Sequence, residues 1–331
     1  MRKVNETMEV YDFNGYPELN ESLGGNSGSK LIVVINGEKW MLKFPKTTIG
    51  MKNVEDSYTT SPLSEYLGSH IYQILGYNAH ETILGIKDEK IVVGCRLFAE
   101  RGQLLEFREI KNIYNKELEE RLEQSLSDSS EIMHSTSIES VIIHLRNNPI
   151  LKNVHGAEEM FWDQTIIDGL INNNDRNSGN WGLIKEAGNY IMSPVYDNGG
   201  SFSNKLSNDQ IFEIMNDKER FLQSAGNGIT AFSSKGKVLL FSDLLKYENN
   251  VLKERVLRLV PLISRKIREI HRMIDDIPER YGNFEVMSRI RKDFYKEGIK
   301  YRYENILKPR YQEIKKERQI SRTNHNQQPE R

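Results

Sequence analysis

The chain has 331 residues, of which 37% are hydrophobic and 28% are charged, with a single cysteine and a net charge of −1. This composition indicates a soluble globular protein large enough for two lobes, and it excludes a disordered chain and a disulfide framework. No apolar run approaches the roughly 18 residues of a membrane-spanning helix, and the first residues lack the apolar core of a signal peptide. We therefore expect a cytoplasmic protein, unless it is exported without a classical signal.

The first hundred residues predict a small antiparallel sheet with one helix. The glycine-rich stretch SLGGNSGSK leads into the apolar run LIVVI, and an Asn-Gly pair at 36–37 marks a tight hairpin into EKWMLKFP, which ends at Pro45. Apolar residues at spacings of three and four predict an amphipathic helix over 61–75, with Ser61 as its cap and Pro62 at its first position. Two further strands follow in ETILGIKDEKIVVGCRLF.

From about residue 104 the pattern becomes helical, with helices predicted at 115–126, 137–146 and 157–171. Two short strands are predicted next, in WGLIK and NYIMSPVYD. Beyond residue 250, one apolar stripe indicates a long helix: Val256, Leu259, Val260, Ile263, Ile267, Ile270, Ile274 and Ile277.

This order predicts a β-rich nucleotide-binding lobe at 1–103, an α-rich catalytic lobe at 104–318 and a disordered tail at 319–331. Residues 300–331 carry nine Lys or Arg against four Asp or Glu. That excess could meet an acidic partner, but a solvated helix end is the simpler interpretation.

The asparagine-rich string INNNDRNSGNWG at 171–182 contains the first candidate catalytic residues. Asp175 and Asn180 are five residues apart, which is the spacing of the catalytic Asp and the metal-binding Asn in kinase catalytic loops. The following strand pair ends in PVYDNGG, where Asp197 supplies a second carboxylate for a hard cation such as Mg²⁺. Taken singly, each of these residues is also what a helix end or a turn uses.

The N-terminal sheet supplies further elements in the order that a kinase has them. Alternation in KWMLKF places Met41 and Lys43 on one strand face, where the lysine could contact nucleotide phosphates and the methionine the adenine. Glu65 lies at the edge of the apolar stripe of the first helix and could hold Lys43, although a solvent-facing lysine and an ordinary first-turn acid are the simpler alternatives. Backbone N–H groups suited to phosphate, without a Walker A pattern, are offered by Gly24, Gly25, Asn26, Ser27 and Gly28.

Seven stretches between about residues 22 and 203 carry a family resemblance: GGNSGSK, MLKFP, SEYLGSHIYQILG, ETILG, KIVVGC, FWDQTIIDGLINNNDRNSGNWG and PVYDNGGS. They are similar to the HipA-like serine/threonine kinases, and within these most closely to the short CtkA-type proteins. The resemblance implies an α+β, bilobal, protein kinase-like fold related to phosphoinositide kinases, with ATP and Mg²⁺ as cofactors. By position it makes Asp175 the catalytic base, Asn180 and Asp197 the metal ligands, and Lys43, held by Glu65, the contact to the α- and β-phosphates.

The sequence departs from that family in two places. Asn177 stands two residues after the catalytic Asp, where family members usually carry His. HipA itself has an additional N-terminal subdomain and an autophosphorylated loop serine, whereas here Ser27 and Ser29 are available without clear register. We expect autophosphorylation at one of these two serines, and the prediction does not extend to a toxin role.

The sequence therefore predicts an ATP- and Mg²⁺-dependent serine/threonine protein kinase with a protein substrate, and with an antitoxin-like or regulatory partner as a further expectation. Neither membrane binding nor direct nucleic-acid binding is expected. Two alternatives stay open: a pseudokinase that binds nucleotide and signals by shape, and a small-molecule kinase of the aminoglycoside or choline type. A third, hydrolysis at a metal shared by Asp163, Asp168, Asp175 and Asp197, is disfavoured because the first two lie about 140° apart around one helix.

Overall fold

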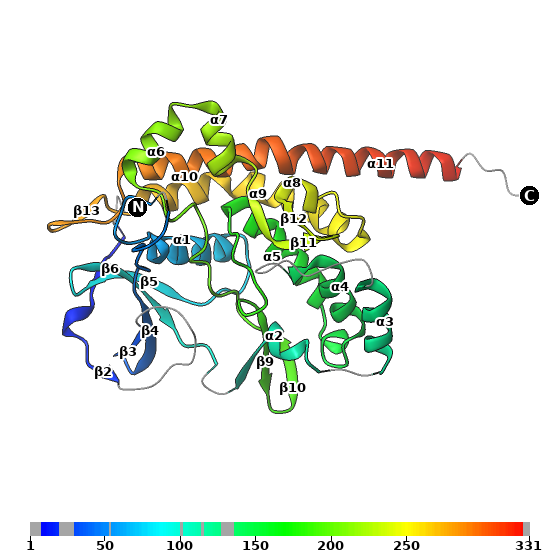
Figure 1. The fold of residues 1–331 in the computed structure, drawn as a ribbon, viewed down its shortest axis with the longest axis horizontal. Coiled ribbons are helices and arrows are strands. Elements are labelled where there is room, and N and C mark those ends of the chain that lie inside the picture. The colour runs from blue at the N-terminus through cyan, green and yellow to red at the C-terminus, as the bar shows by residue number, and fades with distance from the viewer. Residues whose placement is uncertain are drawn as a thin grey trace, which may run out of the picture.

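A computed structural model describes residues 8–19, 30–52, 54–99, 102–113, 116–126 and 136–326. Figure 1 shows its helices and strands in chain order. The strands are β1 (Tyr11–Asp12), β2 (Glu18–Leu19), β3 (Lys30–Ile35), β4 (Glu38–Lys43), β5 (Thr82–Lys87), β6 (Lys90–Arg96), β7 (Gln103–Glu106), β8 (Thr136–Ser137), β9 (Gly182–Glu186), β10 (Asn189–Met192), β11 (Ile229–Ser234), β12 (Lys237–Leu240), β13 (Arg280–Tyr281) and β14 (Phe284–Glu285).

The α-helices are α1 (Ser61–Ile74), α2 (Phe107–Ile110), α3 (Lys116–Leu126), α4 (Ile138–Asn147), α5 (Ala157–Ile171), α6 (Asn208–Met215), α7 (Lys218–Phe221), α8 (Phe241–Leu244), α9 (Asn250–Asp276), α10 (Arg289–Arg302) and α11 (Lys308–Asn326). Two 3₁₀ turns, η1 (Phe13–Gly15) and η2 (Leu151–Asn153), and two π-helical segments, η3 (Leu222–Gly226) and η4 (Tyr303–Leu307), complete the set.

A six-stranded sheet in the order β1-β5-β6-β4-β3-β2 forms the N-terminal part, and α1 packs against β5 and β6 (Figure 1). The predicted hairpin joins β3 to β4, and its two turn residues, Asn36 and Gly37, both have positive φ, as a type I′ turn requires. Strand alternation places Trp40 and Leu42 in a small core on one face of the sheet. The other face, which includes Lys43, is left for α1.

The first helix begins as predicted, but its cap is one residue earlier. Thr60 is the N-cap, Ser61 is the first helical residue, and the first helical bond runs from the Ser64 N–H to the Thr60 carbonyl. The Thr60 hydroxyl does not cap the helix and donates instead to the Asn204 carbonyl. Because neighbouring Ser and Thr residues are both good caps, the sequence alone could not decide between them.

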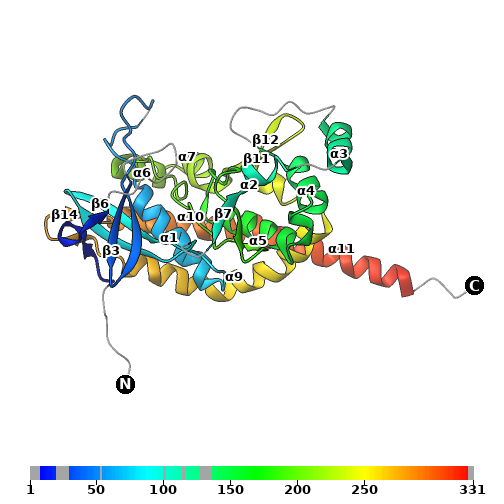
Figure 2. The same cartoon turned by 90° about the horizontal axis from the view of Figure 1, so that it is seen from below.

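The larger part of the fold is built around α5, which contacts α4, α9 and α10 and is buried nearly all round. Helix α9 runs along α1 and α5, as Figure 2 shows, and presents the predicted stripe to them. Ile267 is only half-buried, and Ile277 lies just beyond the helix end, but the other predicted members are buried within it. Because α5 is packed on nearly all sides, it anchors the start of the asparagine-rich loop that follows it.

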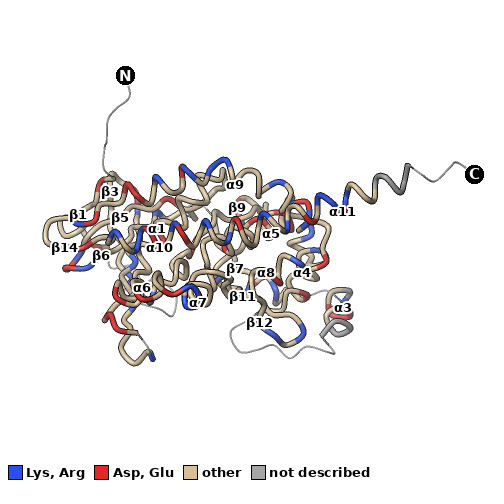
Figure 3. Tube along the Cα trace, turned by 90° about the horizontal axis from the view of Figure 1, so that it is seen from above, with Lys and Arg blue, Asp and Glu red and all other residues tan. Residues whose placement is uncertain are grey.

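The C-terminal helix is longer than predicted. α11 continues to Asn326, so residues 319–326 are helical instead of belonging to a disordered tail; residues 327–331 lie outside the described part. Lys, Arg, Glu and Gln, all good helix formers, supply ten of the nineteen residues of α11, although only Gln319 and Arg322 of them lie in 319–326. Lys and Arg recur along α9 and α11, which Figure 3 shows in blue.

Three smaller sheets complete the fold: β10-β9-β7, β12-β11-β8 and the β13–β14 hairpin. The β9–β10 hairpin follows the asparagine-rich string, and its turn residues Ala187 and Gly188 both have positive φ. An isolated bridge between Ala79 and Val195 then ties the chain after β10 to the six-stranded part. In the described part of the chain, no helix has the length and apolar character needed to span a membrane.

Candidate active site

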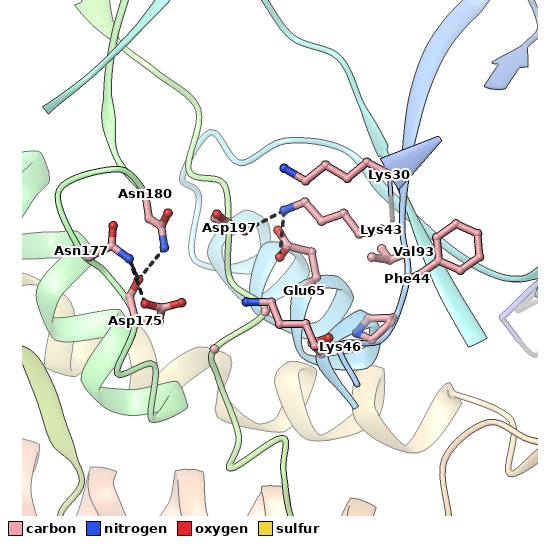
Figure 4. Close-up of a pocket in the computed structure, with 14 residues that line it drawn as sticks. Lys30, Lys43, Phe44, Lys46, Glu65, Val93, Asp175, Asn177, Asn180 and Asp197 are labelled. Carbon is pink, nitrogen blue, oxygen red and sulfur yellow. Dashed lines mark hydrogen bonds and ion pairs between the residues drawn. The ribbon is translucent and has the colours of Figure 1, made fainter. Parts of the chain in front are cut away.

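A cavity of about 160 Å³ lies between β4, α1 and the two loops that follow α5 and β10 (Figure 4). Its lining consists of Lys30, Lys43, Phe44, Lys46, Ser61, Pro62, Glu65, Val93, Asp175, Asn177, Asn180, Asp197, Gly199 and Gly200. Five of the predicted site residues therefore line one cavity: Lys43, Glu65, Asp175, Asn180 and Asp197.

Of the remaining predicted site residues, only Met41 lies in the described part of the chain. Met41 lies opposite Cys95 on β6 and packs at the edge of the larger core, so it is not among the residues that line the cavity. The glycine-rich loop, with Gly24, Gly25, Asn26, Ser27, Gly28 and Ser29, lies outside the described residues.

A lysine with two carboxylates closes one side of the cavity. Lys43 Nζ lies 2.8 Å from Asp197 Oδ1 and 3.3 Å from Glu65 Oε2. Burial alone would lower the pKa of Lys43, but the carboxylates of Glu65 and Asp197 outweigh it and raise that pKa above its ordinary value. Lys43 is therefore protonated and positively charged at neutral pH.

Glu65 is almost completely buried, on the face of α1 that meets the sheet. Burial would raise the pKa of its carboxyl, but Lys43 and then His80, whose Nε2 lies 2.9 Å from Glu65 Oε1, hold that pKa well below its usual range. His80 is itself buried and was not predicted as a site residue. Nothing near it in the sequence signals this contact, because His80 reaches Glu65 only through the packing of α1 on the sheet.

Asp197 has a backbone conformation that is unusual for a side-chain-bearing residue. Its φ is 60°, in the left-handed region, where a non-glycine residue pays about 1–3 kcal/mol. Its side chain remains 45% exposed, and Figure 4 shows it at the cavity beside Lys43. Burial would raise the pKa of Asp197, but Lys43 outweighs it and keeps that pKa below its ordinary value, so the carboxylate is ionised.

The asparagine-rich string folds into a loop that holds Asp175 by its neighbours. Asn177 Nδ2 donates to Asp175 Oδ1 at 2.9 Å, and Asn177 Oδ1 accepts from the Gly179 N–H. Asn180 Nδ2 donates to the Asp175 carbonyl at 2.6 Å, which turns the amide oxygen of Asn180 toward Asp197 (Figure 4). Carboxylate and amide oxygens are the ligands that Mg²⁺ prefers, so Asn180 and Asp197 offer donor types suited to this cation.

A buried arginine inside the same loop, Arg176, was not predicted from the sequence as part of the site. Arg176 forms a bidentate ion pair with Asp168 of α5, at 2.7 and 3.0 Å, and donates to the carbonyls of Asn180 and Tyr196. It also donates to Asn198 Oδ1 at 2.6 Å. One guanidinium therefore fixes the loop, the end of α5 and the segment around Asp197.

Asp168 is held from a second side as well, because it accepts from the Tyr72 hydroxyl at 2.9 Å and from Asn173 Nδ2 at 3.0 Å. Asp163, five residues earlier on the same helix, pairs with Arg255 of α9 instead. The two acids therefore belong to separate ion pairs, as the helix geometry predicts. The only sequence signal for the Asp168 pair was an arginine directly after Asp175.

No protein-family model matches the chain. The serine/threonine-protein kinase CtkA of Helicobacter pylori (strain J99) is 27% identical over 308 residues, which cover 91% of this chain and 87% of that protein.

Two solved structures share the fold. The crystal structure of the H. pylori proinflammatory kinase CtkA superposes with a TM-score of 0.77 at 24% identity, covering 93% of this chain and 99% of that one. HipA of Shewanella oneidensis MR-1, in a complex with HipB and its operator DNA, has a TM-score of 0.50 at 15% identity, with 92% of this chain and 69% of that one covered. The sequence similarity to CtkA runs through almost the whole chain and the fold agrees with it, so the chain resembles this serine/threonine-protein kinase in sequence and shares the fold of CtkA and HipA.

Proposed function

We propose that the protein transfers the γ-phosphoryl group of ATP to a Ser or Thr hydroxyl of a protein substrate, in a reaction that depends on Mg²⁺. One observation carries this proposal. Lys43, Glu65, Asp175, Asn180 and Asp197 come from a strand, a helix and two loops, and they line a single cavity. A chain that used these residues only as caps, turns or surface charges would have no reason to bring them together.

Each side chain would have a distinct role in the transfer. Lys43, held by Glu65, would contact the α- and β-phosphates, and Asn180 and Asp197 would hold Mg²⁺. Bound Mg²⁺ would neutralise the charge that develops on the transferring group. Asp175 would accept the proton of the hydroxyl as its oxygen bonds to the γ-phosphorus and the bond to the β-phosphate oxygen breaks.

Asn177 would keep the Asp175 carboxylate in a fixed orientation through the 2.9 Å bond to its Oδ1. An amide does this without titrating near neutral pH, unlike the family histidine at this position. Autophosphorylation at Ser27 or Ser29 is part of the proposal, because both serines belong to the glycine-rich loop expected beside the γ-phosphate. HipA is seen with HipB, and a regulatory protein partner for this chain is the corresponding proposal.

The direct test is transfer of labelled γ-phosphate from ATP, with and without Mg²⁺, by the wild type and by Asp175→Asn. The variant should lose about 10²–10⁴ in rate and melt at the wild-type temperature, because a general base in a polar loop supports no core. Asp209→Asn, which changes an exposed acid on α6, is the matched control and should keep wild-type activity. Nucleotide binding without transfer by the wild type, or an active Asp175→Asn, would contradict the proposal.

A further inference from the structure

A second hollow, of about 810 Å³, adjoins the cavity on the side of Asp175. The two share four lining residues: Lys46, Asp175, Gly199 and Gly200. A ligand that lies in the larger hollow can therefore contact Asp175, which lines both spaces. We call this larger hollow the acceptor groove; its other residues come from the segment after β4, the end of α5, residues 203–206, η3, and the facing ends of β11 and β12.

The floor of the acceptor groove is built from polar groups in a fixed arrangement. Asn172 Nδ2 donates to Ser203 Oγ at 3.2 Å and to the Ser224 carbonyl at 3.4 Å, and Ser203 Oγ donates to the same carbonyl at 2.9 Å. Asn172 and Ser203 both have positive φ, 56° and 53°, a conformation that side-chain-bearing residues keep only where their surroundings enforce it. A Cβ at Gly228 would lie 1.8 Å from Asn172 Oδ1, so the floor also excludes a side chain there.

The charged lining of the groove is positive apart from Asp175 itself. Among the described lining residues, the charged side chains are Lys46, Lys205 and Asp175. Both lysines are exposed, and neither makes an ion pair with another described residue. Lys46 stands where the groove meets the cavity, so a negative group beside the reacting hydroxyl would come close to it.

Apolar side chains line other parts of the same groove. Met51, Ile229 and Leu240 are 39%, 52% and 37% exposed, so their apolar surface is open to a ligand in the groove. Ile229 and Leu240 are register partners on β11 and β12, so they form one apolar step. The groove thus combines two lysine side chains, a hydrogen-bonded polar floor and a pair of exposed apolar side chains on β11 and β12.

We propose that the acceptor groove binds the segment of the protein substrate that carries the reacting Ser or Thr, and that it selects an acidic residue close to that hydroxyl and an apolar residue further along. The inference rests on the proposed kinase function. It deepens that function by naming the chemistry of the substrate: an extended, acidic and partly apolar peptide. A basic peptide would place like charges against Lys46 and Lys205, which disfavours it.

Four synthetic peptides with one serine each test this preference: acidic with a leucine, acidic without it, neutral, and basic with the leucine. Transfer of phosphate from Mg·ATP is measured beside binding of the fluorescently labelled peptides without nucleotide. The acidic peptide with leucine should have a kcat/KM about tenfold above that of the basic one, as expected when a few exposed charge pairs change from attractive to repulsive. Equal rates for all four peptides, or a preference for the basic one, would overturn the proposal and leave the kinase function intact.

Matched variants locate the preference in the groove. Lys205→Glu should lower kcat/KM for the acidic peptides by about tenfold and favour the basic one, whereas Lys152→Glu, an exposed lysine outside the groove, should change neither. Ile229→Ser should remove the advantage of the leucine, whereas Ile320→Ser on α11 should keep it. If the four peptides bind with the predicted ranking of affinities but none is phosphorylated, the groove assignment would be supported and the proposed kinase activity would be contradicted. Failure of every peptide to bind, or a preference unaffected by Lys205→Glu, would overturn the groove assignment.

Discussion

The pair between Lys43 and Glu65 gives the sharpest prediction about how the cavity works. Glu65→Gln keeps the shape of the side chain but removes its charge. At 3.3 Å the attraction between the two ions is about 5 kcal/mol for an effective dielectric constant of about 20, part of which offsets the desolvation of the two groups. Because Lys43 keeps Asp197 as a partner at 2.8 Å, we expect the free energy of unfolding to fall by about 3 kcal/mol, the lower end for breaking a buried pair.

The same change should alter the response to Mg²⁺. Without Glu65, Asp197 is the one partner of Lys43 left among the described carboxylates, and Lys43 then competes with the cation for it. We expect the Mg²⁺ concentration for half-maximal activity to rise by about tenfold, which corresponds to about 1.4 kcal/mol of added competition. The two measurements are urea denaturation and a Mg²⁺ titration of phosphate transfer.

The pH dependence of the free energy of unfolding tests whether the charge of Glu65 causes the loss of stability. Because the folded-state pKa of Glu65 lies below the unfolded value, its contribution is fully present above about pH 4.3 and is lost as the pH falls through the folded pKa. The stability difference between wild type and Glu65→Gln should therefore be constant at neutral pH and shrink in acid. Glu81→Gln removes an exposed partner of Arg96 and should cost less than about 1 kcal/mol. A Glu65→Gln variant that matched this control in both stability and Mg²⁺ response would refute the reasoning.

Three further predictions concern the loops. Asn180→Ala should raise the Mg²⁺ concentration for half-maximal activity with little change in melting temperature, and a variant that only melts earlier would leave Asn180 as a turn residue. Asp168→Asn should lower the free energy of unfolding by about 3–5 kcal/mol, measured by urea denaturation, because it leaves the buried Arg176 without its carboxylate; an unchanged midpoint would contradict this. Mass spectrometry after incubation with Mg·ATP should find phosphate on Ser27 or Ser29 and lower activity in the modified protein; labelling confined to other sites would exclude both serines.

Local patterns were enough to predict the strands and helices that position the cavity, among them β4, α1 and α5. The Asn-Gly hairpin, the three-four spacing of α1 and the apolar stripe of α9 each depend on residues a few positions apart, which is the range that sequence periodicity covers. Alternation placed Met41 and Lys43 on one face, but it does not say how far along the strand a cavity extends. Two residues are about 6.6 Å of strand, which is enough to leave Met41 beside Cys95 and outside the cavity lining.

The groups that hold the site could not be found in this way. His80 reaches Glu65, and Tyr72 reaches Asp168, only after the helix and sheet have packed, so no local spacing records either contact. Asp168 was considered as a metal ligand because it is an acid, and the structure gives it a buried guanidinium instead. Motifs in the sequence identify candidate catalytic residues more readily than they identify the residues that hold those candidates in position.

The arrangement around Asp197 shows why those positioning residues matter for function. Its neighbours on both sides are held by one group, because Arg176 donates to the Tyr196 carbonyl and to Asn198 Oδ1. The left-handed backbone of Asp197 is therefore enforced from both sides, and the direction of its carboxylate is set by an arginine that need not touch the substrate. It follows that Asp168→Asn should weaken the Mg²⁺ response as well as stability, since a looser Arg176 lets Asp197 relax away from Asn180. A variant that lost stability but kept the wild-type Mg²⁺ dependence would show that Arg176 only supports the fold.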